Sequence, residues 1–224
     1  MSSNTDTDWD ALYVRDAIVP GLDCLPWDIG EPQPPIMALE SAGKITGPVL
    51  DAGCGLGATA LRLAAMGYSV TAFDISPSAV TKAKREAERI DVKVDFFVGD
   101  AMNFSGFDEH FATLIDSSLY HSIPAAGQDA YLSCAHRATR AGGVLHILTF
   151  SDAAPFPAET PNRPNCSSRE ALVARVSQCW KVDKVSPSRI TAWMPTGFLE
   201  GDVALDSVGR VEIPAWLLSA HKYS

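Results

Sequence analysis

The chain has 224 residues, of which 46% are hydrophobic and 20% are charged, a composition typical of a folded globular protein rather than a disordered one. Its formal net charge of −9 argues against sequence-independent binding to nucleic acid or to anionic membranes, because both need a basic surface. The first ten residues are polar and acidic, unlike a signal peptide, and we therefore expect a cytoplasmic protein whose partners are small molecules.

The N-terminal forty residues are rich in aromatic residues and proline. Trp9, Tyr13 and Trp27 precede a proline cluster at 31–35. These prolines should end one helix and begin another, because proline suits the first turn of a helix. We expect residues 1–40 to form a helical cap and residues 41–224 to form the main domain, the two together making a single structural domain.

Short apolar strands and amphipathic helices alternate from residue 48 onward. Strands are expected at 48–51, 68–74, 92–100, 110–116 and 142–150, and helices at 58–67, 76–90 and 123–139. A proline-rich loop, a helix at 167–180 and two late strands at 181–193 and 213–223 follow. Repeated strand–helix units predict an α/β protein with a Rossmann-like, doubly wound sheet of about seven strands in a three-layer αβα fold. Ligands bind such sheets at the carboxyl ends of the strands.

Residues 49–59 read VLDAGCGLGAT, with Gly53, Gly55 and Gly57 directly after the first strand. Such a turn lets a ligand approach the backbone and the free N–H groups of the following helix. A triphosphate site would need Lys-Ser or Lys-Thr after the last glycine, and a dinucleotide site favours G-x-G-x-x-G, so neither pattern is met. Cys54 within the loop either fills a tight turn or acts as a reactive thiol.

A carboxylate stands at the end of each of the first three expected strands. Asp51 would repel a pyrophosphate and suits an amino group or a sulfonium. Asp74 suits both hydroxyls of a ribose, and Asp100 suits the amino group of adenine. One such acid alone is as often a helix cap or a turn residue. Three at successive strand ends favour a cofactor that contains a nucleoside and carries positive charge.

Three stretches, 49–84, 96–104 and 140–150, closely resemble the class I S-adenosylmethionine-dependent methyltransferases, and the likeness covers roughly residues 40–150. It implies S-adenosyl-L-methionine as cofactor, S-adenosyl-L-homocysteine as product, and an antiparallel last strand supplied by 213–223. The cofactor-binding residues that it implies are Asp51, Gly53, Gly55, Gly57, Asp74, Ile75, Asp100, Ala101, Asp116 and Ser117.

The segment PWDIGEPQPPI at 26–36 is similar to one in the thiopurine, thiol and halide methyltransferases and in bacterial relatives that methylate heterocyclic toxins and quinols. This likeness implies a role in detoxification. It also implies that Trp9, Tyr13 and Trp27 close over the cofactor. Trp9 and Tyr13 would equally serve as core residues one turn apart on an amphipathic helix.

His121 and Asp116, from the run DSSLYH after the fourth strand, are the candidate catalytic residues. His121 has the titration range of a general base, although packing a loop is the commoner role of a histidine. Asp116 would contact the cofactor or orient the acceptor. Heterocycles, phenols or quinols, and thiols are all compatible acceptors, and transfer to an O, S or N atom would depend largely on alignment in a water-poor pocket. Phe156 and Arg163 are further candidates for the acceptor pocket.

Two other functions remain open: an NAD(P)-dependent Rossmann oxidoreductase, and a protein that binds S-adenosylmethionine without catalysis. No metal site is expected, because the five cysteines form no C-x-x-C pair and no cluster with histidine. We expect a monomer or homodimer that binds neither nucleic acid nor membranes.

Overall fold

The computed structural model describes residues 7–15, 22, 24–160, 163–195, 197–201, 203 and 205–223. Parts of the expected N-terminal cap and of the proline-rich loop therefore lie outside the described residues. A seven-stranded sheet in the order β3-β2-β1-β4-β5-β7-β6 forms the middle of the molecule. Its strands are β1 (Val49–Ala52), β2 (Val70–Asp74), β3 (Asp95–Val98), β4 (Phe111–Ser117), β5 (Thr139–Phe150), β6 (Lys181–Ala192) and β7 (Val211–His221).

The first five strands run parallel, and β7 runs antiparallel to both of its neighbours, β5 and β6. The expected Rossmann-like sheet with an antiparallel last strand is confirmed. The strand β4 reads FATLIDS and is buried along nearly its whole length, as befits a central parallel strand covered on both faces.

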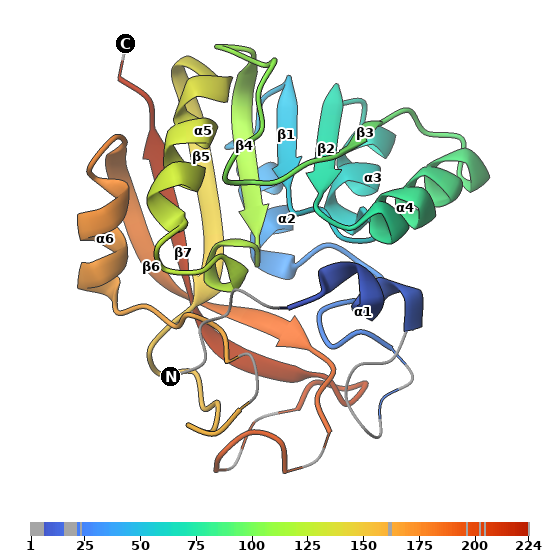
Figure 1. Ribbon diagram of the computed structural model, residues 1–224, viewed down its shortest axis with the longest axis vertical. Helices are drawn as coiled ribbons and strands as arrows, with labels where there is room; N and C mark the ends of the chain where they lie inside the picture. Colours follow the sequence, from blue (N-terminus) through green and yellow to red (C-terminus); the bar gives the residue numbers. More distant parts are fainter. Residues whose placement is uncertain are drawn as a thin grey trace.

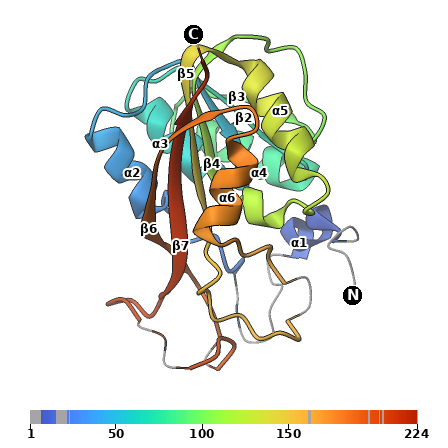
Figure 2. The same cartoon turned by 90° about the vertical axis from the view of Figure 1, so that its left-hand side faces the viewer.

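Helices cover both faces of the sheet, in three layers. Figure 2 shows α2 and α3 on one side of the strands and α5 and α6 on the other. The helices are α1 (Trp9–Arg15), α2 (Pro34–Ser41), α3 (Ala58–Ala65), α4 (Pro77–Arg89), α5 (Gln128–Ala138) and α6 (Arg169–Val176), with a short 3₁₀ helix, η2 (Tyr120–Ser122). Ser76 caps the N-terminus of α4, because its side chain accepts a hydrogen bond from the Ala79 N–H.

The order of the strands places a crevice beyond the carboxyl ends of β1 and β4. β1 lies between β2 and β4. From β1 the chain adds β2 and β3 on one side and then crosses back to add β4 and β5 on the other. Ligands bind at such a switch point. Figure 1 shows α1 below the carboxyl ends of β1 and β2, where it covers this edge of the sheet.

The segment that precedes α2 is joined to the far edge of the sheet. Trp193, directly after β6, donates its backbone N–H to the Pro26 carbonyl at 2.7 Å. The buried Gln33 amide donates to the Thr191 carbonyl at 2.8 Å and accepts the Thr191 N–H at 2.9 Å. Residues near both ends of the chain therefore wall the same crevice.

Candidate active site

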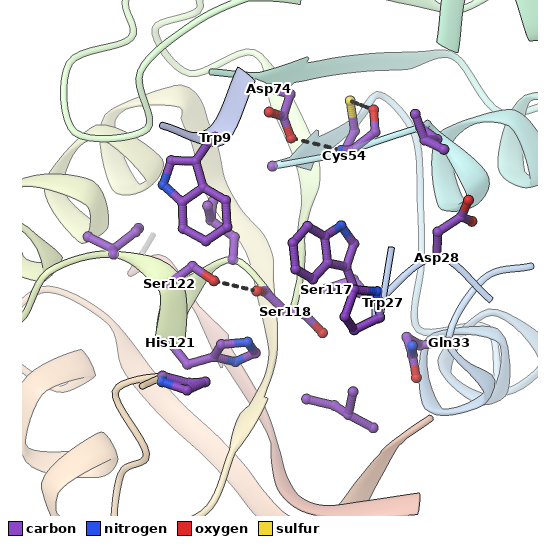
Figure 3. Close-up of a pocket in the computed structure, with 18 of the residues that line it drawn as sticks. Trp9, Trp27, Asp28, Gln33, Cys54, Asp74, Ser117, Ser118, His121 and Ser122 are labelled. Carbon is purple, nitrogen blue, oxygen red and sulfur yellow. Dashed lines mark hydrogen bonds between the residues drawn. The ribbon is translucent and has the colours of Figure 1, made fainter. Parts of the chain in front are cut away.

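A cavity of about 350 Å³ lies at the carboxyl ends of the central strands. Most of the residues expected in the site line it: Trp9, Tyr13, Trp27, Asp51, Gly53, Gly55, Asp74, Ile75, Asp100, Ala101, Ser117, His121 and Phe156. Three expected residues, Gly57, Asp116 and Arg163, are not part of its lining. Figure 3 shows Trp9, Trp27, Asp74, Ser117 and His121 around the cavity.

The glycine loop needs glycine at two positions beside the cavity. Gly53 and Gly55 have φ values of +66° and +54°, a region that other residues rarely adopt. A Cβ on Gly53 would lie 2.8 Å from the Leu119 side chain, and one on Gly55 would lie 2.9 Å from the Tyr13 hydroxyl. Burial raises the pKa of the Cys54 thiol, which keeps it protonated and favours its packing role.

Asp51 presents an unsatisfied carboxylate oxygen at the cavity. The residue is only 2% exposed, and its Oδ2 atom has no hydrogen-bond partner among the described residues. Burial, together with the charges of Asp116 and Asp74, raises its pKa to about 7, against a backbone hydrogen bond from Ala60 that lowers it. A buried, unpaired carboxylate of this kind suits a positively charged ligand group.

Asp74 and Asp100 are held by backbone hydrogen bonds at the edge of the cavity. Asp74 accepts the N–H of Gly55 on Oδ2 and that of Ser76 on Oδ1, each at 2.9 Å. Asp100 accepts the Met102 N–H at 2.9 Å. Burial is the main reason that the pKa of Asp74 is raised. These bonds fix both carboxylates and leave further lone pairs for a ligand.

Helix α1 is fastened to the N-terminus of α4. Asp10 accepts hydrogen bonds from the Ser76 hydroxyl at 2.6 Å and from the Ser78 N–H at 2.8 Å. The Lys82 ammonium donates to the Tyr13 carbonyl at 2.8 Å. A carboxylate at a helix N-terminus is also stabilised by the free N–H groups there.

The three aromatic residues of the N-terminal segment pack together and also line the cavity. The Trp27 ring lies edge-on to those of Trp9 and Tyr13, with centroids 6.0 Å and 6.2 Å away. The Trp27 indole N–H donates to the Tyr13 hydroxyl at 3.1 Å. Tyr13 is buried, and burial raises the pKa of its hydroxyl. These side chains therefore pack against one another and line the site at the same time.

Asp116 is fully buried and organises the turn after β4. Its Oδ1 atom accepts the N–H groups of Leu119 at 2.9 Å and Tyr120 at 3.1 Å. Burial raises the pKa of Asp116 to about 7. Asp116 does not line the cavity; instead it holds the turn that leads to His121.

His121 lines the cavity with its ring against Phe150, at a centroid distance of 4.1 Å and an interplanar angle of 31°. Its Nδ1 atom accepts the backbone N–H of Phe150 at 3.3 Å and lies 3.4 Å from the Thr149 hydroxyl. Burial lowers the pKa of His121 to about 3, so the ring is neutral at neutral pH.

Sequence reasoning did not find most of the wall opposite the carboxylates. This wall is largely apolar and comes from segments distant in the chain: Pro26, Ile123, Pro124, Phe150, Pro164, Ile190, Ala192, Met194 and Phe198. The run AWMPTGFL at 192–199 is an apolar signal beyond a strand end, but only the position of β6 in the sheet shows that it reaches the cavity.

Comparisons with known proteins agree with this geometry. The model of a methyltransferase domain family matches residues 49–143. A 2-heptyl-1-hydroxyquinolin-4(1H)-one methyltransferase of Mycobacteroides abscessus is 41% identical over 204 residues, which cover 88% of each chain. The chain belongs to the class I S-adenosylmethionine-dependent methyltransferases.

Two solved structures resemble this methyltransferase. One comes from a study of the conversion of a disulfide bond into a thioacetal group during echinomycin biosynthesis; it is 35% identical, with a TM-score of 0.82 over 96% of this chain and 90% of its own. The other is a Burkholderia thailandensis 1,6-didemethyltoxoflavin-N1-methyltransferase with S-adenosylhomocysteine bound. Its 20% identity and TM-score of 0.62, over 84% of this chain and 76% of its own, show a shared fold.

The expected cofactor and enzyme class are confirmed by these matches. The methyltransferase uses S-adenosylmethionine, and the nicotinamide alternative finds no support in them. The residues present fit this cofactor, because an unpaired buried carboxylate and two glycines without room for a Cβ border the same cavity. Within the described part of the chain, no helix is long and apolar enough to cross a membrane.

Proposed function

We propose that this methyltransferase transfers a methyl group to an O, S or N atom of a small, flat and largely apolar aromatic or heterocyclic acceptor, or of a thiol. The observation that carries this proposal is one continuous cavity with two unlike ends. The carboxylates and the glycine loop come from β1 to β3, whereas Phe150, Ile190, Ala192, Met194 and Phe198 come from β5, β6 and the segment after β6, on the other side of the sheet order.

The carboxylate end would hold S-adenosylmethionine, which supplies an electrophilic methyl group. Asp51 would face the amino group of the methionine moiety, Asp74 with Ile75 the ribose, and Asp100 with Ala101 the adenine. Gly53 and Gly55 would let the cofactor approach the backbone. Gly57, the N-cap of α3 with a left-handed φ of +85°, would shape the turn. Ser117 would contact the cofactor from the end of β4.

The apolar end would bind the acceptor by burial of its flat surface. The 41% identical relative is named for a quinolone that carries a heptyl chain and a hydroxyl group on the ring nitrogen. The 35% identical structure comes from work on sulfur chemistry. Both support an acceptor that is bulky, apolar and nucleophilic at oxygen or sulfur.

The N-terminal segment would act as a cap, as expected for residues 1–40. Trp9, Tyr13 and Trp27 line the cavity, and α1 is tied to α4. Such a cap would exclude water, so that a charged cofactor and an electron-rich acceptor meet in a poorly solvated space. A monomeric or homodimeric state, a cytoplasmic location and the lack of a nucleic-acid partner stay predictions, which light scattering, cell fractionation and a gel-shift assay would test.

A turnover screen tests the proposed function. The purified protein is incubated with S-adenosylmethionine and with separate N-hydroxyquinolones, quinols, thiols and N-heterocycles, and formation of S-adenosylhomocysteine is measured. We expect turnover with at least one acceptor, and Asp74→Asn should lose most of the cofactor affinity while Glu88→Ala, an exposed acid on α4, keeps it. Tight binding of S-adenosylhomocysteine without turnover of any acceptor would favour the non-catalytic alternative.

A further inference from the structure

We propose that Ser118 and His121 form a pair of neutral hydrogen-bond donors that holds the reacting oxygen or sulfur of the acceptor as an anion. This inference rests on the proposed function. It assigns no general base to the site. The enzyme would select acceptors that are already ionised when they bind.

The hydrogen bonds of His121 determine where its proton lies. A backbone N–H can only donate, so the Nδ1 atom that receives the Phe150 N–H must present its lone pair. A neutral imidazole then carries its proton on Nε2. Burial keeps the ring neutral, since it lowers the pKa of His121 to about 3. The free edge of the ring is therefore a donor, because both side-chain hydrogen bonds of His121 among the described residues are made by Nδ1.

Ser118, three residues before His121 in the same turn after β4, offers a second donor. The residue lines the cavity, and its buried hydroxyl has no hydrogen-bond partner among the described residues. An unpaired buried hydroxyl is unfavourable, and a ligand that accepts a hydrogen bond from it would remove this penalty. Figure 3 shows Ser118 and His121 among the residues that line the cavity.

The backbone at Ser118 is strained. Its φ is +80°, a conformation that is unfavourable for an ordinary residue and is common at functional sites. The Ser118 N–H donates to the Leu148 carbonyl at 3.0 Å, and its carbonyl accepts from the Ser122 hydroxyl at 3.4 Å. The neighbouring strand β5 and the 3₁₀ helix η2 therefore both hold this turn in place.

The immediate surroundings of His121 are uncharged. The pKa of His121 departs from its ordinary value through burial alone, without a contribution from any charged group. The residues packed against its ring, Thr149 and Phe150, are uncharged. The titratable groups that line the cavity lie in the N-terminal segment, the glycine loop and the ends of β2 and β3: Tyr13, Asp28, Glu31, Asp51, Cys54, Asp74 and Asp100.

The transfer step needs no proton acceptor in the protein under this assignment. The acceptor gives up its proton to solvent before the step. A lone pair on its oxygen or sulfur forms the new bond to the methyl carbon, while the bond from that carbon to the sulfonium sulfur breaks and its electrons stay on sulfur. The negative and positive charges cancel. Two neutral donors stabilise the anion without removing its lone pair from the reaction.

The consequence concerns acceptor selection. N-hydroxy heterocycles and aromatic thiols ionise near neutral pH, whereas simple phenols have a pKa of about 10, like tyrosine. Amines and ring nitrogens react as neutral nucleophiles and have no anion to offer. We therefore expect acidic O–H and S–H acceptors to be preferred over phenols of the same size and over amines.

Substitution of His121 separates a donor from a base. His121→Gln places an amide N–H donor near the position of Nε2 but cannot take up a proton. We expect His121→Gln to keep kcat/KM within about tenfold of the wild type, and His121→Ala and Ser118→Ala each to lose about 10²-fold, the usual cost of removing one such donor. Equal losses in His121→Gln and His121→Ala, with unchanged melting temperatures, would overturn the assignment.

A spectroscopic measurement tests the pair without turnover. The absorption spectrum of an N-hydroxyquinolone or a nitrothiophenol is recorded in complex with the protein and S-adenosylhomocysteine, one pH unit below the pKa of the free compound. We expect the ionised spectrum with the wild type and the neutral spectrum with the double variant Ser118→Ala/His121→Ala. A neutral spectrum with the wild type would refute the donor pair, whereas absence of methylation with every acceptor would refute the proposed function instead.

Discussion

We expect Asp51 to couple cofactor binding to pH. Its pKa is raised to about 7, so the free protein carries a proton there at pH 6 and has lost most of it at pH 8. A positively charged amino group beside Asp51 favours the ionised carboxylate. We expect S-adenosylhomocysteine to bind about tenfold more tightly at pH 8 than at pH 6, because one pKa unit corresponds to a factor of about ten. Titration calorimetry at both pH values measures this.

The control for this prediction is Asp51→Asn, which has the same shape and no charge to gain. Its affinity for S-adenosylhomocysteine should be weaker and nearly independent of pH. Proton release, measured by calorimetry in buffers of different ionisation enthalpy, should also disappear. A wild-type affinity that is flat across this range would show that Asp51 does not face the positive group.

Asp116 should prove more important for stability than for chemistry. Asp116→Asn keeps the oxygen that accepts from Leu119 and Tyr120 and removes a buried charge that is unfavourable above pH 7. We expect a melting temperature several degrees higher at pH 8, an unchanged one at pH 5, and a kcat within about tenfold of the wild type. A loss of about 10³-fold or more in kcat would instead support a direct role in transfer.

For individual residues, the sequence predicted which kinds of side chain lie at the site better than it predicted their hydrogen bonds. Asp51, Asp74 and Asp100 lie where strand ends were expected, because the chain order of alternating strands and helices dictates which residues meet at one edge. The proton position on His121 depends on the Phe150 N–H, which belongs to another strand. The positive φ of Ser118 likewise cannot be predicted from the fact that the residue is a serine.

Among the elements, the segment before α2 depends on β6 for its position. The Gln33 side chain makes two buried hydrogen bonds with the Thr191 backbone. Gln33→Ala would leave a buried N–H and C=O unpaired, at about 1–3 kcal/mol each. We expect a melting temperature lower by several degrees and a raised KM for the acceptor, because Gln33 and Ala192 both line the cavity.

Gln178→Ala is the matched control, since Gln178 is exposed beyond the end of α6. It should change neither the melting temperature nor the KM. If Gln33→Ala lowered stability and left KM for the acceptor unaltered, the segment would serve the fold without shaping the acceptor end.

The boundaries of the elements show where local pattern fails. The helix expected at 123–139 begins at Gln128, because a short 3₁₀ helix and Pro124 occupy the preceding turn. The strand expected from residue 142 begins at Thr139, where it pairs with Phe111 before a shift of register. The insertion of β7 between β5 and β6 is a long-range pairing. The likeness to the family predicted that this strand is antiparallel, but not its place between β5 and β6.

For the whole molecule, the buried acids and the buried histidines change the free energy of unfolding in opposite directions as pH rises. Asp51 and Asp116 have raised pKa values of about 7. The folded protein therefore holds these protons more tightly than the unfolded chain does, and the free energy of unfolding falls as pH rises toward and through 7. His121 and His146 have lowered pKa values, and their effect is complete once the pH exceeds 6.5, the ordinary pKa of histidine. We therefore expect the free protein to lose stability between pH 6.5 and 7.5.

Urea unfolding at these pH values measures this loss. Saturating S-adenosylhomocysteine should reduce it, because the bound amino group would favour the ionised form of Asp51. The double variant Asp51→Asn/Asp116→Asn should show a flat dependence. A free protein whose stability rises steadily from pH 6.5 to 7.5 would contradict the raised pKa values of both carboxyl groups.

The bonds between the segment before α2 and the end of β6 also bear on the order of synthesis. Gln33 and Thr191 are 158 positions apart, so the partner of this segment leaves the ribosome long after the segment itself. Contacts so distant in the chain form late, because the intervening elements must first bring their ends together. We therefore expect the five parallel strands and the carboxylates of the cavity to assemble on a nascent chain while the apolar wall from β6 is still missing. The enzyme would gain its acceptor pocket only in the last step of its own biogenesis.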